Sequence, residues 1–456
     1  MSLRLLHYSD LETALDDPER CARLAGTLAA RRDGDTVVIG TGDNTAPGAL
    51  SLATEGRAAL EFFRTVSPDV DTFGNHDFDF GPEVARRNAG DAPQAWLCAN
   101  ATRDGERFAA DVGVEPGAVV ETDDYRVGVV GVAHPETVGI NPAAEGVTFS
   151  DPVPAVREEA AALRERGVDR VVVASHCGNG DARIARETDV DVVLGGHVHD
   201  VHVETVDDTL TVRPGRGGTY VAEVEFEPST AATVREVDDG HRDDDLAAAL
   251  RDTLARHGLD ETVATVADPV ELTEESVMAA ESRAGNFVAD ALRWGAGADV
   301  AISPAGALRA DGALDGDVTA AQVINLTPYE DDLAVVSLSG DRLLDALAEL
   351  PLGYHLDDFP PRYCSHVSGA RVVWDDGDGV LRAATVGGEP VDPDREYTLA
   401  VADYLVETDH VSAAYGEGDV VRRCGVAHEA VVDYAREHGI APEVEGRIER
   451  PALGDA

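Results

Sequence analysis

Short apolar runs alternate with amphipathic stretches through about the first 225 residues, and this alternation narrows the possible folds more than any other feature of the sequence. The runs predicted to be strands are residues 3–8, 36–39, 70–73, 95–99, 125–132, 170–174 and 190–194. Helical patterns lie between several of them. One begins at Asp16-Asp17-Pro18, where aspartate can cap a helix and proline fits its first turn, and another covers residues 154–166. The alternation predicts an α/β layered domain with a largely buried sheet.

The second half of the chain has a different pattern. An acidic segment at 234–246 leads into a predicted helix that ends near residue 257, and this segment is the best candidate for a linker. Beyond it we expect helices at 284–294 and 341–350, strands at 299–303 and 333–338, and further apolar stretches at 366–374, 380–386 and 397–405. The sequence therefore predicts a domain at 1–235, an acidic linker and helix at 236–264, and a mixed α+β domain at 265–450.

The charge of the chain excludes several classes of function. Its 456 residues include 87 aspartates and glutamates against 37 basic residues, all of them arginine, so the net charge is −50. Without lysine there is no lysine nucleophile, Schiff base or P-loop lysine, and binding to nucleic acid polymers or anionic membranes lacks a basic patch. Because 43% of the residues are hydrophobic, the chain can still build packed cores. The composition is typical of haloarchaeal proteins that work in a high-salt cytosol.

Targeting signals and cysteine usage point to the same compartment. The first ten residues, MSLRLLHYSD, contain no apolar region of a signal peptide, and no apolar run is long enough to span a membrane. Five cysteines are scattered without the spacing of a disulfide framework or a zinc ribbon. We expect a cytoplasmic protein that does not bind membranes.

Clusters of polar residues follow five of the predicted strands, and they contain the candidate metal-ligating and catalytic side chains. α/β sheets place their sites at the ends of strands, and glycines beside each cluster let the backbone turn sharply. Each cluster alone is weak evidence, because a Gly-Asp pair after a strand is usually a turn. Together they form a set of oxygen and nitrogen ligands that suits two divalent cations sharing one carboxylate. The residues concerned are Asp10, Glu12, Asp43, Asn75, His76, Asp79, His176, His197 and His199.

In their order along the chain these motifs resemble the calcineurin-like metallophosphatase superfamily. The stretches GNHDFDFG, GNFVADAL, ADVAISPAGALR and YTLAVADYL resemble the two-domain 5′-nucleotidase family within it. The resemblance implies a four-layer α/β/β/α metallophosphatase domain followed by an α+β substrate domain. It also implies hydrolysis of a small phosphomonoester, such as a nucleotide, with two divalent metal ions, for which we expect manganese ahead of zinc, cobalt or nickel.

The resemblance assigns a role to each residue of the set. Asp43 bridges the metals, Asp10 and His199 hold one of them, and the other is held by Asn75, His176 and His197. His76 is the implied catalytic histidine, and Asp79 orients its ring. Two cations polarise the phosphoryl oxygens and lower the pKa of a water molecule, which provides hydroxide for in-line attack, while an imidazole that titrates near neutrality can supply a proton.

The first departure from the family pattern lies at Glu12. The family has Asp-x-His where this chain has Asp10-Leu11-Glu12. In one interpretation Glu12 ligates the first metal, which would favour Mn²⁺ over Zn²⁺ and make the bound water less acidic. In the other, Glu12 points to solvent and the first metal is weakly held.

The second departure lies in the C-terminal half, where family members bind the nucleoside. Arg309 matches the family arginine, although Pro304 and Ala307 replace an asparagine and a glycine that precede it. Tyr329 and Tyr404 fall where two aromatic residues sandwich the base, although both could equally be core residues. The family's Gly-Gly-Asp-Gly is absent, and Asp409 or His410 could replace its aspartate.

Other functions remain open at this point. Related enzymes hydrolyse 2′,3′-cyclic phosphodiesters, nucleotide sugars or sulfur esters, and a binding or sensing protein could have lost turnover through Glu12. A purely structural halophile protein is the third alternative, and the intact ligand set argues against it. Cys177 is interpreted as a small buried filler. Arg213 and Arg216 in RPGRGG resemble a phosphate-binding loop in charge only, and they are interpreted as residues of a turn.

Overall fold

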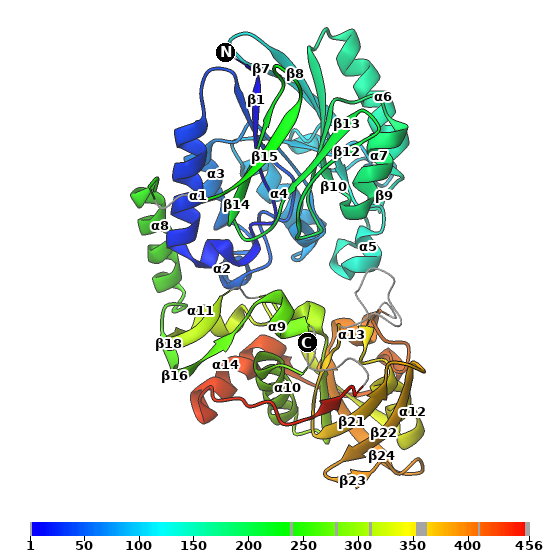
Figure 1. Cartoon of the computed structure of the whole chain (residues 1–456). Coiled ribbons are helices and arrows are strands. Elements are labelled where there is room, and N and C mark those ends of the chain that lie inside the picture. The colour runs from blue at the N-terminus through cyan, green and yellow to red at the C-terminus, as the bar shows by residue number, and fades with distance from the viewer. Residues whose placement is uncertain are drawn as a thin grey trace. The chain divides into compact units, whose positions relative to one another are not determined.

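The computed structural model describes residues 2–237, 240–278, 281–309, 312–352, 363–408 and 411–451 (Figure 1). The chain divides into two compact units, Met1–His257 and Gly258–Ala456. No helix in the described part of the chain is long and apolar enough to cross a membrane.

Two six-stranded sheets form the centre of the first unit. In spatial order, the first contains β15 (Ala231–Glu236), β14 (Tyr220–Glu225), β1 (Arg4–Tyr8), β2 (Thr36–Gly40), β3 (Val70–Thr72) and β4 (Ala95–Leu97). The second contains β12 (Val201–Val206), β13 (Thr209–Pro214), β11 (Val192–Gly195), β10 (Arg170–His176), β8 (Arg126–Ala133) and β7 (Gly117–Glu121). A small third sheet joins β6 (Glu106–Arg107), β5 (Ala101–Arg103) and β9 (Thr148–Phe149).

The two large sheets pack face to face because successive side chains of a strand point to opposite faces. Val129 of β8 joins a core with Leu5 and Val37 of the other sheet, whereas its neighbour Val130 packs against Val156 of a helix. Helices α6 (Pro152–Glu165) and α7 (Asp181–Glu187) cover one outer face, and α1 (Pro18–Arg31) and α3 (Ala59–Val66) lie on the other side of the strands (Figure 1). The predicted four-layer α/β/β/α domain is therefore confirmed.

The strands that precede the polar clusters run parallel. β1 pairs with β2 and β2 with β3 in parallel, and β10 pairs in parallel with both β8 and β11. Their carboxyl ends therefore meet at one edge of each sheet, which gathers residues from distant parts of the sequence.

The helix predicted at Asp17-Pro18 begins there. The side chain of Asp17 accepts hydrogen bonds from the backbone N–H groups of Glu19 and Arg20, both at 3.1 Å, and Pro18 is the first helical residue. In the segment expected to be a linker, β15 extends to Glu236 and α8 (Asp244–Arg256) begins eight residues later. Regular structure of the first unit therefore reaches into that segment, and α8 contacts α1.

The second unit contains three further sheets. Its five-stranded sheet has β20 (His366–Ser368), β17 (Val300–Ser303), β24 (Glu396–Ala402), β19 (Asp332–Ser339) and β25 (Val420–Val426) in spatial order. A four-stranded sheet has β23 (Glu389–Pro390), β22 (Val380–Val386), β21 (Ala370–Asp375) and β26 (Ile448–Glu449), and β16 (Thr262–Glu271) pairs with β18 (Ala313–Thr319). The helices are α9 (Glu274–Met278), α10 (Arg283–Ala296), α11 (Ala320–Ile324), α12 (Gly340–Ala348), α13 (Tyr404–Glu407) and α14 (Ala427–His438).

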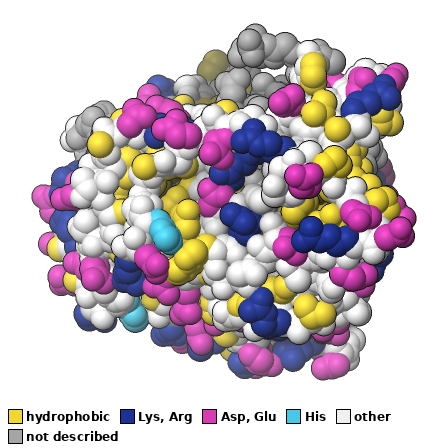
Figure 2. All heavy atoms as spheres, turned by 90° about the horizontal axis from the view of Figure 1, so that it is seen from below, with side chains coloured by type: hydrophobic (Ala, Val, Ile, Leu, Met, Phe, Trp, Pro, Cys, Tyr) yellow, Lys and Arg dark blue, Asp and Glu magenta, His cyan; other side chains and the backbone are white. Residues whose placement is uncertain are grey.

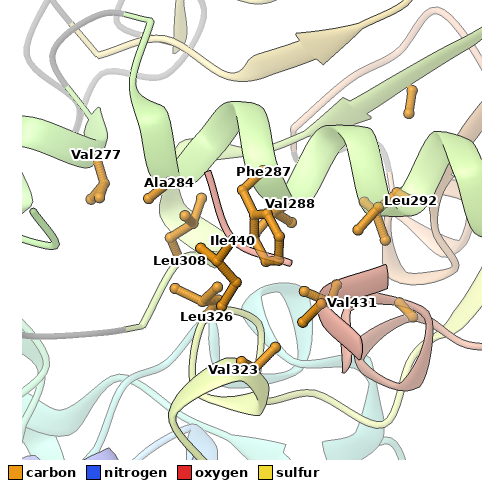
Figure 3. Packing of buried hydrophobic residues seen from close by; sticks show 14 of the residues in the cluster. Val277, Ala284, Phe287, Val288, Leu292, Leu308, Val323, Leu326, Val431 and Ile440 are labelled. Carbon is orange, nitrogen blue, oxygen red and sulfur yellow. The ribbon is translucent and has the colours of Figure 1, made fainter. Parts of the chain in front are cut away.

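Helix α10 carries one core of this unit. Its apolar face presents Phe287, Val288 and Leu292, which lie among side chains of other elements such as Val431 of α14 and Ile440 (Figure 3). The amphipathic pattern AGNFVADALRW predicted this helix, because apolar residues that recur every three to four positions form one buried stripe.

Arginines on the surface lie next to acidic side chains. Figure 2 shows this mixture on one face of the molecule. On the second unit, for example, Arg382 pairs with Asp375 at 2.8 Å and Arg436 with Glu261 at 3.1 Å. Exposed pairs of this kind contribute about 0–1 kcal/mol each to the free energy of unfolding. The surface arginines therefore neutralise nearby acidic side chains but stabilise the fold only weakly.

We predict that Gly285→Ala destabilises the second unit. Gly285 of α10 faces the ring of the buried His366, and an added Cβ would overlap that ring. His366 is held by a hydrogen bond from its Nε2 to the carbonyl of Val277 (2.7 Å), and burial lowers the pKa of His366 to about 4, so the ring stays neutral. Overpacking of this kind costs about 1–3 kcal/mol.

Urea and thermal unfolding would measure the change, with Gly418→Ala as the matched control, since an added Cβ at Gly418 meets nothing within 4 Å. Equal stabilities of the two variants would contradict the packing argument.

Candidate metal centre

The backbone of four predicted ligands adopts the left-handed conformation that non-glycine residues avoid. The φ angles are +50° at Asp10, +45° at Glu12, +51° at Asp43 and +74° at His197. Such residues cost about 1–3 kcal/mol each and concentrate at functional sites. This strained conformation occurs in the loops that follow β1, β2 and β11. We infer that these loops are shaped to direct the side chains of the predicted ligands rather than to minimise backbone strain.

Two groups of side chains converge at the carboxyl ends of the strands. The ligand atoms of Asp10, Glu12 and His199 all lie within 4.8 Å of one another. The same holds for Asp43, His176 and His197.

His176, the last residue of β10, joins the two sheets. Its Nε2 lies 3.1 Å from Oδ2 of Asp43, and its Nδ1 lies 2.6 Å from the carbonyl oxygen of Thr41. A backbone carbonyl at Nδ1 places a proton there, which leaves the lone pair of Nε2 available to ligate a cation shared with Asp43.

Asn75 adds an amide oxygen to the second group. Its Oδ1 lies 2.8 Å from Nδ1 of His197, and the rings of His176 and His197 are 5.3 Å apart. Metal–ligand bonds of about 2.0–2.2 Å place neighbouring ligand atoms about 3 Å apart, so this spacing fits one shared cation.

Glu12 does not point to solvent. Only 2% of the residue is exposed, and its Oε1 lies 3.2 Å from Nε2 of His199. A third group of ligand atoms within 4.8 Å contains Glu12, Asp43 and His76. The solvent-facing interpretation of Glu12 is therefore wrong, and the carboxylate lies where a ligand would lie.

The buried carboxylates need positive charge beside them. Burial raises the pKa of Asp10 to about 6. Burial also acts to raise the pKa of Asp43, but the imidazoles of His176 and His76 outweigh it and lower that pKa to about 2. In turn, burial acts to lower the pKa of His176, and the carboxylates of Asp43 and Asp10 raise it to about 10. The donor set of three carboxylates, one amide and three imidazoles fits divalent cations, which supply that charge.

His76 is oriented by two residues. Its Nδ1 lies 3.0 Å from Oδ1 of Asp79. Asn141, which the sequence analysis missed, donates one hydrogen bond to Oδ1 of Asp79 and another to the carbonyl of Asn75, both at 2.8 Å. Asn141 therefore connects the partner of the histidine to the backbone of a ligand. The Asn141-Pro142 pair signals a turn but does not reveal this contact.

Asp77 was also missed, and it holds two of the loops together. It accepts hydrogen bonds from the backbone N–H groups of Asp43 (3.0 Å), Gly74 (2.8 Å) and Thr45 (3.1 Å). A Cβ at Gly42, where φ is +86°, would lie 2.5 Å from the backbone nitrogen of Gly74. Glycine at position 42 and Asp77 together allow the second and third loops to approach closely enough to share a site.

Comparisons with known proteins agree with this geometry. Residues 3–201 match the calcineurin-like phosphoesterase family, and residues 262–414 match the 5′-nucleotidase C-terminal domain. The chain therefore combines the two domains of the 5′-nucleotidase family.

Alignments with individual relatives cover different shares of this chain and of the relatives. The trifunctional nucleotide phosphoesterase protein YfkN of Bacillus subtilis is 25% identical over 402 residues, which cover 76% of this chain and 27% of YfkN. An apyrase of Aedes albopictus is 24% identical over 485 residues, covering 89% of this chain and 84% of the apyrase. The 5′-nucleotidase precursor of Thermus thermophilus superposes with a TM-score of 0.84 at 23% identity over 99% of both chains. The chain thus spans about a quarter of YfkN.

The 5′-nucleotidase C-terminal domain brings three predicted substrate residues to one sheet edge. Leu333 of β19 pairs with Ala402 of antiparallel β24, and β17 runs parallel to β24. Tyr329, Tyr404 and Arg309 therefore leave the five-stranded sheet at the same edge.

The immediate surroundings of these three residues differ. Tyr329 accepts a hydrogen bond at its carbonyl from Nδ1 of His428 (2.8 Å), and Arg309 donates to the carbonyl of Gly306 (2.5 Å). Tyr404 begins α13 and is partly packed on a core. Burial, with the charge of Asp331, raises the pKa of Tyr404 to about 12, so its ring is neutral. Asp409 lies outside the described residues.

We predict that Cys177 does not react as a nucleophile. The thiol follows the predicted ligand His176 but is 1% exposed, and its Sγ lies 3.4 Å from the carbonyl oxygen of Ala133. Burial, with the charge of Asp181, raises the pKa of Cys177 far above its usual range, so the thiolate is scarce at about pH 8.

Alkylation of the native protein with iodoacetamide, followed by peptide mass spectrometry, would test this. Half-buried Cys424 serves as the internal control and should be modified first. Modification of Cys177 at a rate equal to that of Cys424 would contradict the prediction.

Proposed function

We propose that the protein is a metal-dependent hydrolase of phosphomonoesters, with a nucleotide as its natural substrate. The observation that carries this proposal is the convergence of two ligand groups with His76, all at the carboxyl ends of the parallel strands.

In this proposal Asp10, Glu12 and His199 hold one cation, and Asn75, His176 and His197 hold the other, with Asp43 between them. Bound divalent cations would polarise the phosphoryl oxygens and acidify a water molecule. The oxygen-rich first group, with two carboxylates and one imidazole, supports manganese more than zinc.

In this proposal His76 supplies a proton to the reacting phosphate ester. Asp79 accepts from Nδ1, so a protonated ring presents its Nε2 proton toward a phosphoryl or leaving-group oxygen. The His76 side chain is 14% exposed, which lets a substrate reach it, while the carboxylates of Asp10, Glu12 and Asp43 stay buried. Asp79 and Asn141 are positioning residues, because they fix the ring through hydrogen bonds.

Three observations support a nucleotide as the substrate. The C-terminal half matches the 5′-nucleotidase domain, relatives carry names such as nucleotide phosphoesterase and apyrase, and two tyrosines share one sheet edge with an arginine. Aromatic rings stack on any base, and an arginine pairs with carboxylates or phosphates. The net charge of −50 supports a high-salt cytosol as the working environment, since salt screens the repulsion between carboxylates.

We predict Mn²⁺-dependent release of nitrophenol from p-nitrophenyl phosphate in molar KCl. His76→Ala should lower kcat by about 10²- to 10⁴-fold, because it removes a positioned proton donor. Asp43→Asn should abolish turnover through loss of the shared carboxylate.

His202→Ala and Asp189→Asn are the matched controls, since neither side chain belongs to a ligand group. The His202 ring lies 3.5 Å from Glu204, and Asp189 lies in an exposed pair with Arg164. Absence of turnover with every divalent metal, in protein shown to be folded, would refute the proposal.

We also predict that Tyr404→Ala raises the KM for nucleotides and leaves the KM for p-nitrophenyl phosphate unchanged. Base stacking contributes about 1–3 kcal/mol, which corresponds to a roughly 5- to 150-fold increase. Tyr404→Phe keeps the ring and should retain the wild-type values. If Tyr404→Ala, folded by thermal unfolding, had the wild-type KM for every nucleotide in a panel, Tyr404 would be a core residue only.

A further inference from the structure

Arg216 lies beside the ligand group of Asp10, Glu12 and His199, although a turn is the default interpretation of its motif RPGRGG. Its Nη1 is 3.8 Å from Oε2 of Glu12 and 3.4 Å from Nδ1 of His199. The loop that carries it follows β13 and is tied to the site by a hydrogen bond from the backbone N–H of Gly217 to the carbonyl of Asp10 (2.8 Å). Positive φ angles at Gly215 (+79°) and Gly217 (+68°) let the loop turn back on both sides of Arg216.

The two oxygens of Glu12 face different partners. Oε1 is 3.2 Å from Nε2 of His199, as expected for two ligands of one cation, whereas Oε2 faces the guanidinium of Arg216. Carboxylates that ligate metals are commonly held by a second partner on their other oxygen. When His199 ligates through Nε2, its Nδ1 carries the proton, so the contact of Arg216 with Glu12 is the one that persists.

The net charge of the metal centre explains why an arginine beside Glu12 matters. Asp10, Glu12 and Asp43 contribute three negative charges, and two divalent cations leave one net positive charge. A neutral histidine in place of Glu12, as in the family pattern, would leave two. Because arginine is always protonated, Arg216 restores the second positive charge.

We propose that Arg216 is a phosphate-binding residue that offsets the extra carboxylate of Glu12. The inference rests on the proposed function and adds a residue to its substrate site. Arg216 is 12% exposed at its side chain, whereas Glu12 is 2% exposed. Of these two facing side chains, Arg216 is thus the one that a phosphate from solvent can reach, and its guanidinium can bind two phosphate oxygens at once.

Titration calorimetry, first with Mn²⁺ and then with inorganic phosphate, tests the roles of Glu12 and Arg216 by measuring binding, so it does not depend on turnover. Arg216→Gln should weaken phosphate binding to the Mn²⁺-loaded protein by roughly 10- to 100-fold, as expected for a charged hydrogen bond. It should leave two bound Mn²⁺ per chain. The double variant Glu12→His/Arg216→Gln regains the original net charge and should bind phosphate within about threefold of wild type.

Arg235→Gln is the control, since Arg235 pairs with Glu223 on an exposed strand of the same unit. Phosphate affinity of Arg216→Gln equal to that of the control would overturn the inference, as would a double variant no better than Arg216→Gln. Turnover is scored separately. Arg216-dependent phosphate binding without any turnover would support the inference and refute the proposed hydrolase, whereas turnover with Arg216-independent phosphate binding would do the reverse.

Discussion

Burial of negative charge at the ends of the central strands is the constraint on which the rest of the first unit depends. Asp10, Glu12 and Asp43 are each at most 2% exposed. An unpaired buried carboxylate is costly, so each needs a positive partner or a set of hydrogen-bond donors. The loops provide both. His176 and His199 face the carboxylates, and the backbone of His76 donates to Oδ1 of Asp43 at 2.7 Å. The left-handed backbone of these loops is the conformational cost of that arrangement.

The lysine-free composition limits how this charge can be offset. Imidazoles, arginines and divalent cations are the remaining positive groups, and imidazoles are also needed as neutral ligands. Burial lowers the pKa of His197 well below its ordinary value, so this ring is a neutral donor rather than a source of charge. An anionic substrate must therefore be held by cations and arginine. The proposed action of a chain at −50 on phosphate therefore requires that positive charge be concentrated at the metal centre.

The strands and the grouping of the candidate ligands were predictable because both follow local rules. An apolar run of four to eight residues that ends in a glycine-rich polar cluster marks a strand and its carboxyl end, and parallel pairing then brings those ends together. Asn141 and Arg216 were not predictable, because their role comes from partners far away in the sequence. Asn141 contacts Asp79 across 62 residues, and only the fold shows it. RPGRGG was interpreted as a turn, but a turn also decides where its arginine points.

The two units differ in the kind of functional residue that they contain. All nine residues predicted at the centre lie in the first unit, so the chemistry there follows from one set of loops. The second unit contributes Arg309, Tyr329 and Tyr404, none of which is a metal ligand in this proposal. Pro304 stands at the family's asparagine position, five residues before Arg309. Under the two proposals, changes in the second unit alter which ester is recognised, whereas Glu12 and Arg216 determine how strongly a phosphate is held. Substrate preference and phosphate affinity then depend on separate residues.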